Sequence, residues 1–339
     1  MLLWDLEFGI RDLTALHQQV RRTIRRYGLL PPGARVLIGL SGGSDSVALT
    51  RVLLDLSEHG EFSIAGLAHL NHGLRPSADR DEAFCREFAA HLALSIVIDR
   101  VDVRSYAETQ GFSIEDASRR LRYDFLERTA LSAGADRIAV GHTQDDQAET
   151  FLLKLMRGAG LTGLGGIYPK RDRIIRPLLD VARADLRGHL AGIGERWIED
   201  ESNEDVDIPR NRVRHRVLPE LELAAGGPTR PAIARAAAVI REDGQWLDEL
   251  SRQHLAAAAV ETDNGLELDL DKLREAPPPV RRRMLLDAMR GLAGGREVGL
   301  EHVEAVLALI DGSQGGVDVP GSRAEIRRGK LFLVQQKRP

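Results

Sequence analysis

The chain has 339 residues, with 47 Lys and Arg against 51 Asp and Glu, and a formal net charge of −4. This balance excludes a uniformly basic nucleic-acid-binding protein, so any contact with RNA must come from local basic clusters. A single cysteine, Cys85, excludes a disulfide framework and a zinc or iron–sulfur site built from several of the chain's own thiolates. We find neither a signal peptide nor an apolar run of about 20 residues, and therefore expect a soluble, cytoplasmic protein with no membrane contact.

Strands and helices alternate through the first half of the chain. A helix is expected within 11–28, where apolar residues recur at helical spacing until two prolines stop it. Short β-branched runs then predict strands near 35–40, 63–70, 95–102 and 137–141, and helical patterns fill the gaps at 46–58, 79–93, 114–133 and 145–157. This order predicts an α/β fold, a Rossmann-like parallel sheet with helices on both faces.

The alternation weakens after residue 158. A further helix is expected at 183–192, and the Gly- and Pro-containing segment 224–231 is typical of a linker. We therefore expect a catalytic domain at 1–222, including the N-terminal helix, and a smaller, mostly helical domain at 228–339. The tail from Val317 to Gln336 predicts short strands at the end of this second domain.

The segment SGGSDS follows the first predicted strand and opens a helix. Ligands of open α/β sheets bind beyond the carboxyl ends of strands, and glycines there let the backbone approach an anion. The segment is not a Walker A loop, because it lacks that motif's lysine. Asp45 would repel a polyphosphate unless Mg²⁺ lay between them, although it could also be an ordinary helix cap. The residues expected to bind the anion are Ser41, Gly42, Gly43, Ser44, Asp45 and Ser46.

A second cluster, GHTQDDQAET, begins where the strand at 137–141 ends. Asp146 and Glu149 are three residues apart, and Asp145 and Glu149 are four apart, so each pair shares one face of the predicted helix. Such carboxylates could bind Mg²⁺ or a cationic amine, or they could simply complement the helix dipole. His142 stands at the same turn and should face the same crevice.

Basic side chains mark further segments. The helix at 114–133 carries Arg122, and the segment 197–219 carries Arg210, Arg212 and Arg214 after a run of acids. Arginines in such runs contact a phosphate backbone in some proteins and are merely solvated in many others. For the histidines of HLNHGLR we prefer a binding loop to a zinc site. The segment GAGLTG at 158–163 matches G-x-G-x-x-G but follows a helix, which argues against a dinucleotide site.

Together these motifs resemble the tRNA(Ile)-lysidine synthetases, a family of PP-loop ATP pyrophosphatases. The resemblance spans about residues 35–219 and is weaker in the last third of the chain, although VDVPGSRAEIRRGKLFL is similar to the family's short C-terminal β segment. One departure is Thr143, where the family often has a second histidine. The segments that carry the resemblance are SGGSDS, HLNHGLR with Ser77 and Asp81, EDASRRLRY, GHTQDDQAET, RGAGLTGLGG, RPLL and WIEDESN…RNRVRH.

The resemblance implies an ATP-dependent carbon–nitrogen ligase that joins free L-lysine to C2 of the wobble cytidine of tRNA(Ile) with a CAU anticodon. The cytidine is first adenylated with release of pyrophosphate, and lysine then displaces AMP to give lysidine. ATP would bind at residues 41–46, with Mg²⁺ on Asp45, while Arg122 and Arg214 would contact the reacting phosphate or nucleotide.

The same resemblance implies that Asp146 and Glu149 bind lysine. The residues with implied catalytic roles are Asp45, Arg122, His142, Asp146, Glu149 and Arg214. The residues expected to contact tRNA are Arg210, Arg212, Arg281 and Arg282. The sequence leaves open whether the chain acts as a monomer or as a homodimer.

Three rival interpretations fit the sequence less well. A tRNA thiolase of the same superfamily generally uses cysteine pairs or an iron–sulfur cluster, whereas Cys85 stands alone. An amidotransferase-type synthetase needs an ammonia source, and Leu2 stands where the glutaminase of asparagine synthetase has its catalytic cysteine. A catalytically silent tRNA-binding relative would lack phosphate-loop or acidic residues, and this chain lacks none of them.

Overall fold

The computed structural model describes residues 14–74, 78–199, 205–312 and 315–336, so Ser77 and most of the WIEDESN segment lie outside the described residues. The chain splits into two compact units, Met1–Val239 and Ile240–Pro339. The expected boundary at 222–228 lies on the turn between α10 (Leu218–Ala225) and α11 (Arg230–Ala258). The division observed instead falls between Val239 and Ile240, inside α11.

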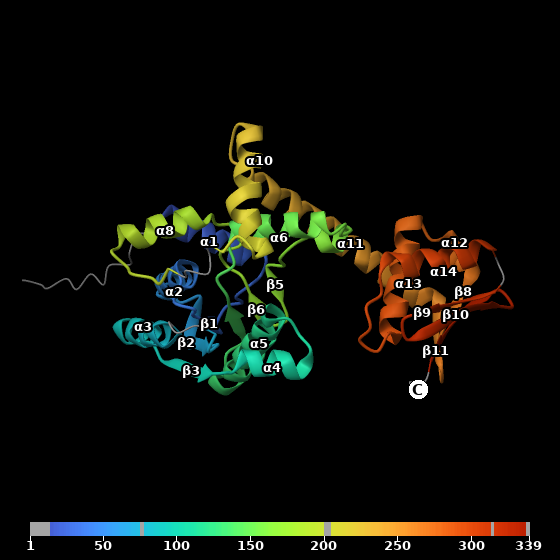
Figure 1. Ribbon diagram of the computed structural model, residues 1–339, viewed down its shortest axis with the longest axis horizontal. Coiled ribbons are helices and arrows are strands. Elements are labelled where there is room, and N and C mark those ends of the chain that lie inside the picture. Colours follow the sequence, from blue (N-terminus) through green and yellow to red (C-terminus); the bar gives the residue numbers. More distant parts are fainter. Residues whose placement is uncertain (1–13, 75–77, 200–204, 313–314, 337–339) are drawn as a thin grey trace, which may run out of the picture. The chain divides into compact units, whose positions relative to one another are not determined.

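The first unit is built on a six-stranded sheet (Figure 1). Neighbouring strands are parallel except for the antiparallel pair β5–β6. The four expected strands are confirmed, each to within two residues. The strands, in their order across the sheet, are β3 (Ile96–Arg100), β2 (Phe62–Asn71), β1 (Ala34–Gly39), β4 (Arg137–Ala139), β6 (Ile174–Ile175) and β5 (Lys170–Arg171).

Helices cover both faces of this sheet, as expected. One core cluster joins the sheet to α1 (Ala15–Arg26), α2 (Ser44–Ser57), α3 (Ala78–His91) and α8 (Arg183–Gly192). The other cluster joins it to α5 (Ile114–Ala133). Within β1, Val36 and Ile38 belong to the first cluster and Leu37 to the second. Because both faces are covered, β1 has a continuous apolar run rather than an alternating one.

The first unit has further helical segments, of which α6 carries the acidic cluster and the others are short. They are α4 (Val103–Gln110), α6 (Gln144–Met156), α7 (Leu161–Leu164), α9 (Pro209–Arg212) and a π-helical segment (Val213–Val217) that runs into α10. Among the residues that the structure describes, no helix has the length and apolar content that a membrane crossing requires.

The second unit combines helices with a five-stranded antiparallel sheet, in the order β7-β8-β11-β10-β9. The expected tail strands are β9 (Gly316–Val319), β10 (Ser322–Arg327) and β11 (Lys330–Gln335). The pair β7 (Ala259–Thr262) and β8 (Gly265–Asp269) was not expected, since the second domain was predicted to be helical before its tail. The hairpin turns at Asp263 and Asn264, which join Thr262 to its partner Gly265, and Asp, Asn and Gly are typical of such turns. The helices are α12 (Leu270–Glu275), α13 (Pro278–Leu292) and α14 (Leu300–Gly312).

Topology fixes where the site lies. β1 pairs with β2 on one side and β4 on the other, so the direction of the chain across the sheet changes at β1. In α/β sheets, ligands bind beyond the carboxyl ends of strands at such a point. The loops there are SGGSDS after β1 and GHTQDD after β4, and they touch. A Cβ on Gly141 would lie 3.1 Å from the carbonyl carbon of Asp45.

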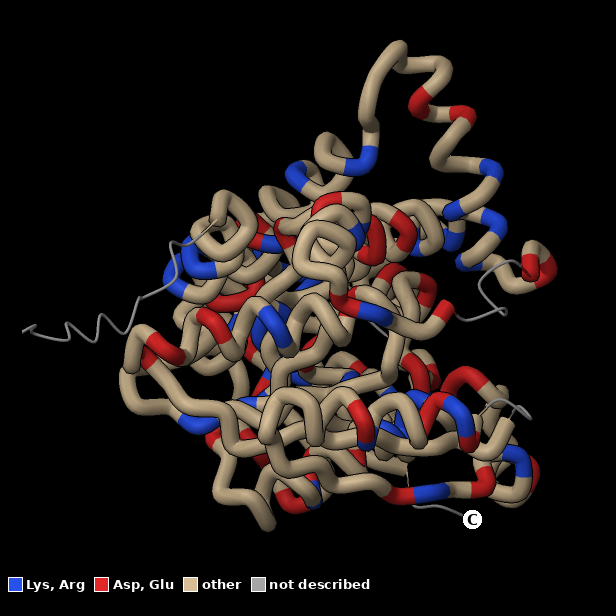
Figure 2. The backbone as a smooth tube through the Cα atoms, turned by 90° about the vertical axis from the view of Figure 1, so that its left-hand side faces the viewer, with Lys and Arg blue, Asp and Glu red and all other residues tan. Residues whose placement is uncertain are grey.

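Charged residues of both signs are spread along the backbone. Figure 2 shows Lys and Arg interspersed with Asp and Glu rather than gathered in one long basic stretch. Contacts with a polyanion therefore depend on individual clusters, as the net charge predicts.

A substitution in the core of the second unit should lower that unit's stability and leave ligand binding by the first unit intact. Leu333 is fully buried in the second unit's core, so Leu333→Ala should cost about 2–5 kcal/mol of that unit's unfolding free energy. ATP binding, measured by calorimetry, should persist. The control is Leu300→Ala, because Leu300 is 57% exposed. Loss of ATP binding in Leu333→Ala would show that the units do not fold separately.

Candidate active site

The SGGSDS loop is a tight turn held by its own hydroxyls. The Ser46 hydroxyl accepts from the Ser41 backbone N–H at 3.1 Å and donates to the Gly43 carbonyl at 3.0 Å. Gly42 has φ +87°, and a Cβ there would lie 2.7 Å from Ile198 Cδ1. A residue with a side chain would therefore meet both backbone strain and a clash. The N-terminal N–H groups of α2 follow directly, as in an anion-binding turn.

The loop is braced by a segment far away in the sequence. The Ile198 N–H donates to the Gly42 carbonyl at 2.9 Å, and Ile198 forms a parallel bridge with Gly43. From the other side, His69 Nδ1 donates to the Leu40 carbonyl at 2.9 Å. His69, one of the two histidines of HLNHGLR, thus supports the backbone of the phosphate loop.

The acidic turn after β4 is organised by a capping box. Asp146 accepts from both the N–H and the hydroxyl of Thr143, at 2.7 and 2.8 Å, and Thr143 accepts from the Asp146 N–H. Thr143 stands where a second histidine was expected from the resemblance, and its hydroxyl supplies this cap. The arrangement fixes the start of α6 and turns Asp146 toward the phosphate loop.

One arginine joins the two loops. The Arg183 guanidinium lies 3.0 Å from Asp45 Oδ2 and 3.0 Å from Asp146 Oδ1, with Glu149 Oε1 at 3.6 Å. Its backbone N–H also donates to Asp145 Oδ2 at 2.8 Å. Arg183 is the first residue of α8, so this single residue connects α2, α6 and α8.

Two further arginines complete the cluster. Arg210 contacts Asp146 Oδ1 at 2.9 Å and Glu149 Oε2 at 2.7 Å, and Arg214 Nε lies 2.6 Å from Glu149 Oε1. Arg210 belongs to α9 and Arg214 to the π-helical segment after it, a rare geometry found often at functional sites. The Glu149 carboxylate is wholly buried, and the guanidinium groups of Arg183, Arg210 and Arg214 surround it.

The surroundings shift the pKa values of Asp45 and Asp146 in opposite directions. Burial, assisted by the charge of Asp146, raises the pKa of Asp45, although Arg183 opposes that rise. Burial alone would raise the pKa of Asp146, but Arg210 and Arg183 outweigh it, and the pKa falls well below its usual range. A carboxylate with so low a pKa holds cations well but is a poor proton acceptor. The structure thus favours Asp146 as a binding group rather than as a base.

His142 is held as a neutral imidazole. Its Nδ1 accepts from Arg176 Nε at 3.2 Å, and burial together with the nearby arginines lowers its pKa to about 3, against the opposing effect of Asp146. Arg176 also donates to the Tyr168 carbonyl at 2.6 Å. His142 therefore offers a neutral imidazole nitrogen at the site and carries no charge at neutral pH.

The other predicted arginines lie in different surroundings. Arg122 is exposed on α5, near enough to His142 to lower its pKa. Arg212 donates to the Val206 and Asp207 carbonyls at the end of its own loop. In the second unit, Arg281 donates to the Arg274 and Ala276 carbonyls, whereas Arg282 is exposed.

Two groups at the site were missed from the sequence, Arg183 and Arg230. Arg230 binds Asp145 Oδ1 at 3.3 Å and Glu222 at 2.6 Å. A signal existed for Arg183, because a cation in the first turn of a helix opposes the helix dipole and calls for a carboxylate partner. For Arg230, next to the expected linker, we find no comparable signal.

The Mg²⁺ predicted on Asp45 can be tested against its surroundings. Asp45 offers a carboxylate beside the Ser44 hydroxyl, at 3.3 Å, and burial raises its pKa despite Arg183, so a further cation would stabilise its charged form. Oxygen donors next to a phosphate-binding turn are what Mg²⁺ requires, so the residues fit the ion.

Cys85 does not resemble a reactive or cluster-binding thiol. It is fully buried, with Sγ 3.4 Å from His69 Nδ1, and burial raises its pKa to about 12. A thiolate would be needed for nucleophilic attack or for iron–sulfur ligation, and this side chain stays protonated.

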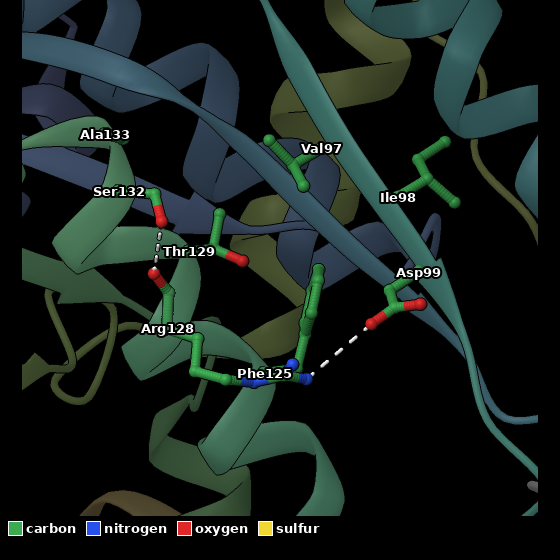
Figure 3. Close-up of a pocket in the computed structure, with 8 residues that line it drawn as sticks. All are labelled: Val97, Ile98, Asp99, Phe125, Arg128, Thr129, Ser132 and Ala133. Atoms are coloured by element: carbon green, nitrogen blue, oxygen red, sulfur yellow. Dashed lines mark hydrogen bonds and ion pairs between the residues drawn. The ribbon is translucent and has the colours of Figure 1, made fainter.

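A shallow pocket lies elsewhere on the first unit, between β3 and α5. Figure 3 shows Val97, Phe125 and their neighbours lining it, with the Arg128–Asp99 ion pair (3.6 Å) across one side. None of its lining residues belongs to the two loops or to the arginine cluster. This pocket therefore lies apart from the candidate site.

The buried His142 should make stability depend on pH. The folded chain keeps His142 neutral down to about pH 3, while the unfolded chain protonates it near pH 6.5. Between these values the unfolded state binds more protons, so stability falls with falling pH, by up to about 1.4 kcal/mol per pH unit. His142→Gln should reduce this slope in denaturant titrations from pH 6.5 to 5, and exposed His91→Gln should not. Equal slopes in all three proteins would contradict the assignment.

Two family models match this chain. Residues 13–221 match the family model of the PP-loop domain, and residues 268–332 match that of the TilS substrate binding domain. A U34-tRNA thiolase from Methanococcus maripaludis that carries a [4Fe-4S] cluster has a similar fold. Its TM-score is 0.55 at 18% identity, over 67% of this chain and 78% of that one.

Curated relatives are more similar in sequence. A tRNA(Ile)-lysidine synthase from Geobacter sulfurreducens is 37% identical, over 92% of this chain and 67% of that protein. The enzymes of the same name from Leifsonia xyli and Chlorobaculum tepidum are 36% and 34% identical, covering 89% and 91% of this chain and 90% and 93% of theirs. Identity of this level along nearly the whole chain, together with the two matching family models, means that the chain belongs to the tRNA(Ile)-lysidine synthase family.

Proposed function

We propose that the chain uses ATP to join free L-lysine to C2 of the wobble cytidine of tRNA(Ile) with a CAU anticodon, forming lysidine and releasing AMP and pyrophosphate. The observation that carries this proposal is the contact between the SGGSDS loop and the acidic start of α6 through Arg183. This contact supports a pyrophosphate site on the loop after β1 beside a lysine site on the acidic turn after β4. The relatives are named for the same reaction.

In the first step, the cytidine 2-carbonyl oxygen attacks the α-phosphorus of ATP, and the bond to pyrophosphate breaks. The N–H groups at the start of α2 and the hydroxyls of Ser41, Ser44 and Ser46 hold the departing pyrophosphate. Arg122 and Arg214 contribute positive charge toward the nucleotide. Asp45 would hold Mg²⁺, whose chemical contribution is to offset negative charge on the leaving group.

In the second step, the ε-amine of lysine attacks C2 and AMP leaves. Free lysine carries two ammonium groups and one carboxylate, and the cluster offers partners of both signs. Asp146 and Glu149 receive ammonium, while an arginine displaced from them can receive the carboxylate. Since the ε-amine has a pKa of about 10.4, it must lose a proton before attack. The lowered pKa of Asp146 makes that residue a poor acceptor of this proton.

The tRNA contacts are assigned to exposed cations in both units. Arg282 is exposed in the second unit, which contains the matched substrate-binding segment, and Arg210 is one-third exposed at the cluster in the first. Contacts of this kind fix the position of the tRNA, while unpaired bases are read individually. We place the reaction in the cytoplasm, where tRNA is available.

Asp45 should be needed for the first chemical step. Asp45→Ala should reduce tRNA-dependent pyrophosphate release below detection, because the leaving group loses its cation site and Arg183 loses a partner. Asp124→Ala, at an exposed acid on α5, should release pyrophosphate at the wild-type rate. An undiminished rate in Asp45→Ala would remove Asp45 from the mechanism.

Arg183 should matter through its geometry as well as its charge. Arg183→Lys keeps the charge but cannot reach Asp45, Asp146 and Glu149 together, so the rate of pyrophosphate release should fall by about 10²-fold. Arg187→Lys, one turn along the same helix at an exposed ion pair with Glu199, is the matched control. If both variants keep the wild-type rate, Arg183 does not position the site.

A further inference from the structure

Three potential metal ligands meet outside the active site. They are His17 on α1, Asp55 on α2 and His189 on α8, and one donor atom from each lies within 4.8 Å of the others. His17 Nε2 is 3.0 Å from Asp55 Oδ2, and the two imidazole rings stand edge to face with centroids 5.3 Å apart. These groups come from three helices of one core cluster, and the catalytic chemistry uses none of them.

One donor atom in this group lacks a partner. His189 Nε2 is buried and makes no hydrogen bond. A buried ring nitrogen without a partner is unfavourable, and most buried polar groups in folded proteins have one. A cation held with His17 and Asp55 would give this nitrogen a partner.

The surroundings of His17 suit a ligand role. Its Nδ1 lies 2.7 Å from the Thr14 hydroxyl. With the proton on Nδ1 donated to Thr14, the lone pair of Nε2 faces Asp55 and His189. Metal-bound histidines almost always donate their other N–H to a fixed acceptor in this way. The nearby cation Arg51 is ion-paired with Glu195 at 3.3 Å, which lessens its repulsion of a metal ion.

We propose that His17, Asp55 and His189 bind a divalent transition-metal ion of the Zn²⁺ class. Two imidazoles and one carboxylate select such an ion over Mg²⁺, which prefers oxygen ligands and keeps much of its water. The site is separate from the Mg²⁺ position proposed at Asp45 and does not rest on the proposed reaction.

The ion would act as a structural clamp. It joins α1 to α2 and α8, and the latter two helices carry Asp45 and Arg183 at their first turns. Fixing these helices at the cluster restrains the two elements that the Asp45–Arg183 ion pair joins at the active site.

The test uses the full chain, without an affinity tag and stripped of metal by a chelator. Zn²⁺ binding is measured by calorimetry in excess Mg²⁺, and Co²⁺ is added in parallel to record the visible spectrum of a nitrogen-ligated site. The variants are His189→Gln and Asp55→Asn. The exposed His91→Gln, in the same unit, is the matched control.

We expect one Zn²⁺ per chain and a rise in Tm on the order of 5 °C at a free Zn²⁺ concentration 100-fold above Kd. His189→Gln and Asp55→Asn should each weaken binding at least about tenfold and lose the Co²⁺ bands, and His91→Gln should bind as wild type. Failure of the wild-type chain to bind Zn²⁺, or unchanged binding in both variants, would overturn the proposal.

Discussion

The ion bridges of Arg183 join the phosphate loop to the acidic turn. This residue neutralises Asp45 on the phosphate loop and Asp146 on the acidic turn at equal distances of 3.0 Å. Both carboxylates are largely removed from water, and removing one partner of a buried ion pair is strongly destabilising because an uncompensated charge remains. Without a cation at this position, two negatively charged loops at the ends of β1 and β4 would repel each other. The contact of Gly141 with Asp45 would then lose its electrostatic support.

The cluster around this arginine has nearly matched opposite charges. Asp45, Asp145, Asp146 and Glu149 face the guanidinium groups of Arg183, Arg210, Arg214 and Arg230. A balanced network can exchange partners at low electrostatic cost. An ammonium group can replace a guanidinium on a carboxylate, and the arginine thereby released can bind a phosphate or a carboxylate. This property suits the proposed binding of a nucleotide, a tRNA and lysine at one site.

The sequence alone located the loops but not the residue that joins them. The strand-end rule places SGGSDS and GHTQDD at one edge because strand and helix periods are local signals. Arg183 is 138 residues from Asp45, and only the tertiary fold brings them together. The division between the units was also missed, since it falls inside the uninterrupted helix α11 rather than at the glycines of 224–231. The β7–β8 hairpin was missed because the second domain was predicted to be helical before its tail, and the turn residues ahead of Gly265 were not interpreted as a hairpin signal.

The account's central claim is that this crevice transfers lysine to an adenylated cytidine. The most direct measurement is to incubate the protein with ATP, lysine and tRNA(Ile) bearing a CAU anticodon, and to analyse the nucleosides by mass spectrometry. We predict a cytidine carrying one lysine that forms only when ATP and lysine are both present. Absence of this adduct, while ATP still yields AMP with another acceptor, would contradict the claim.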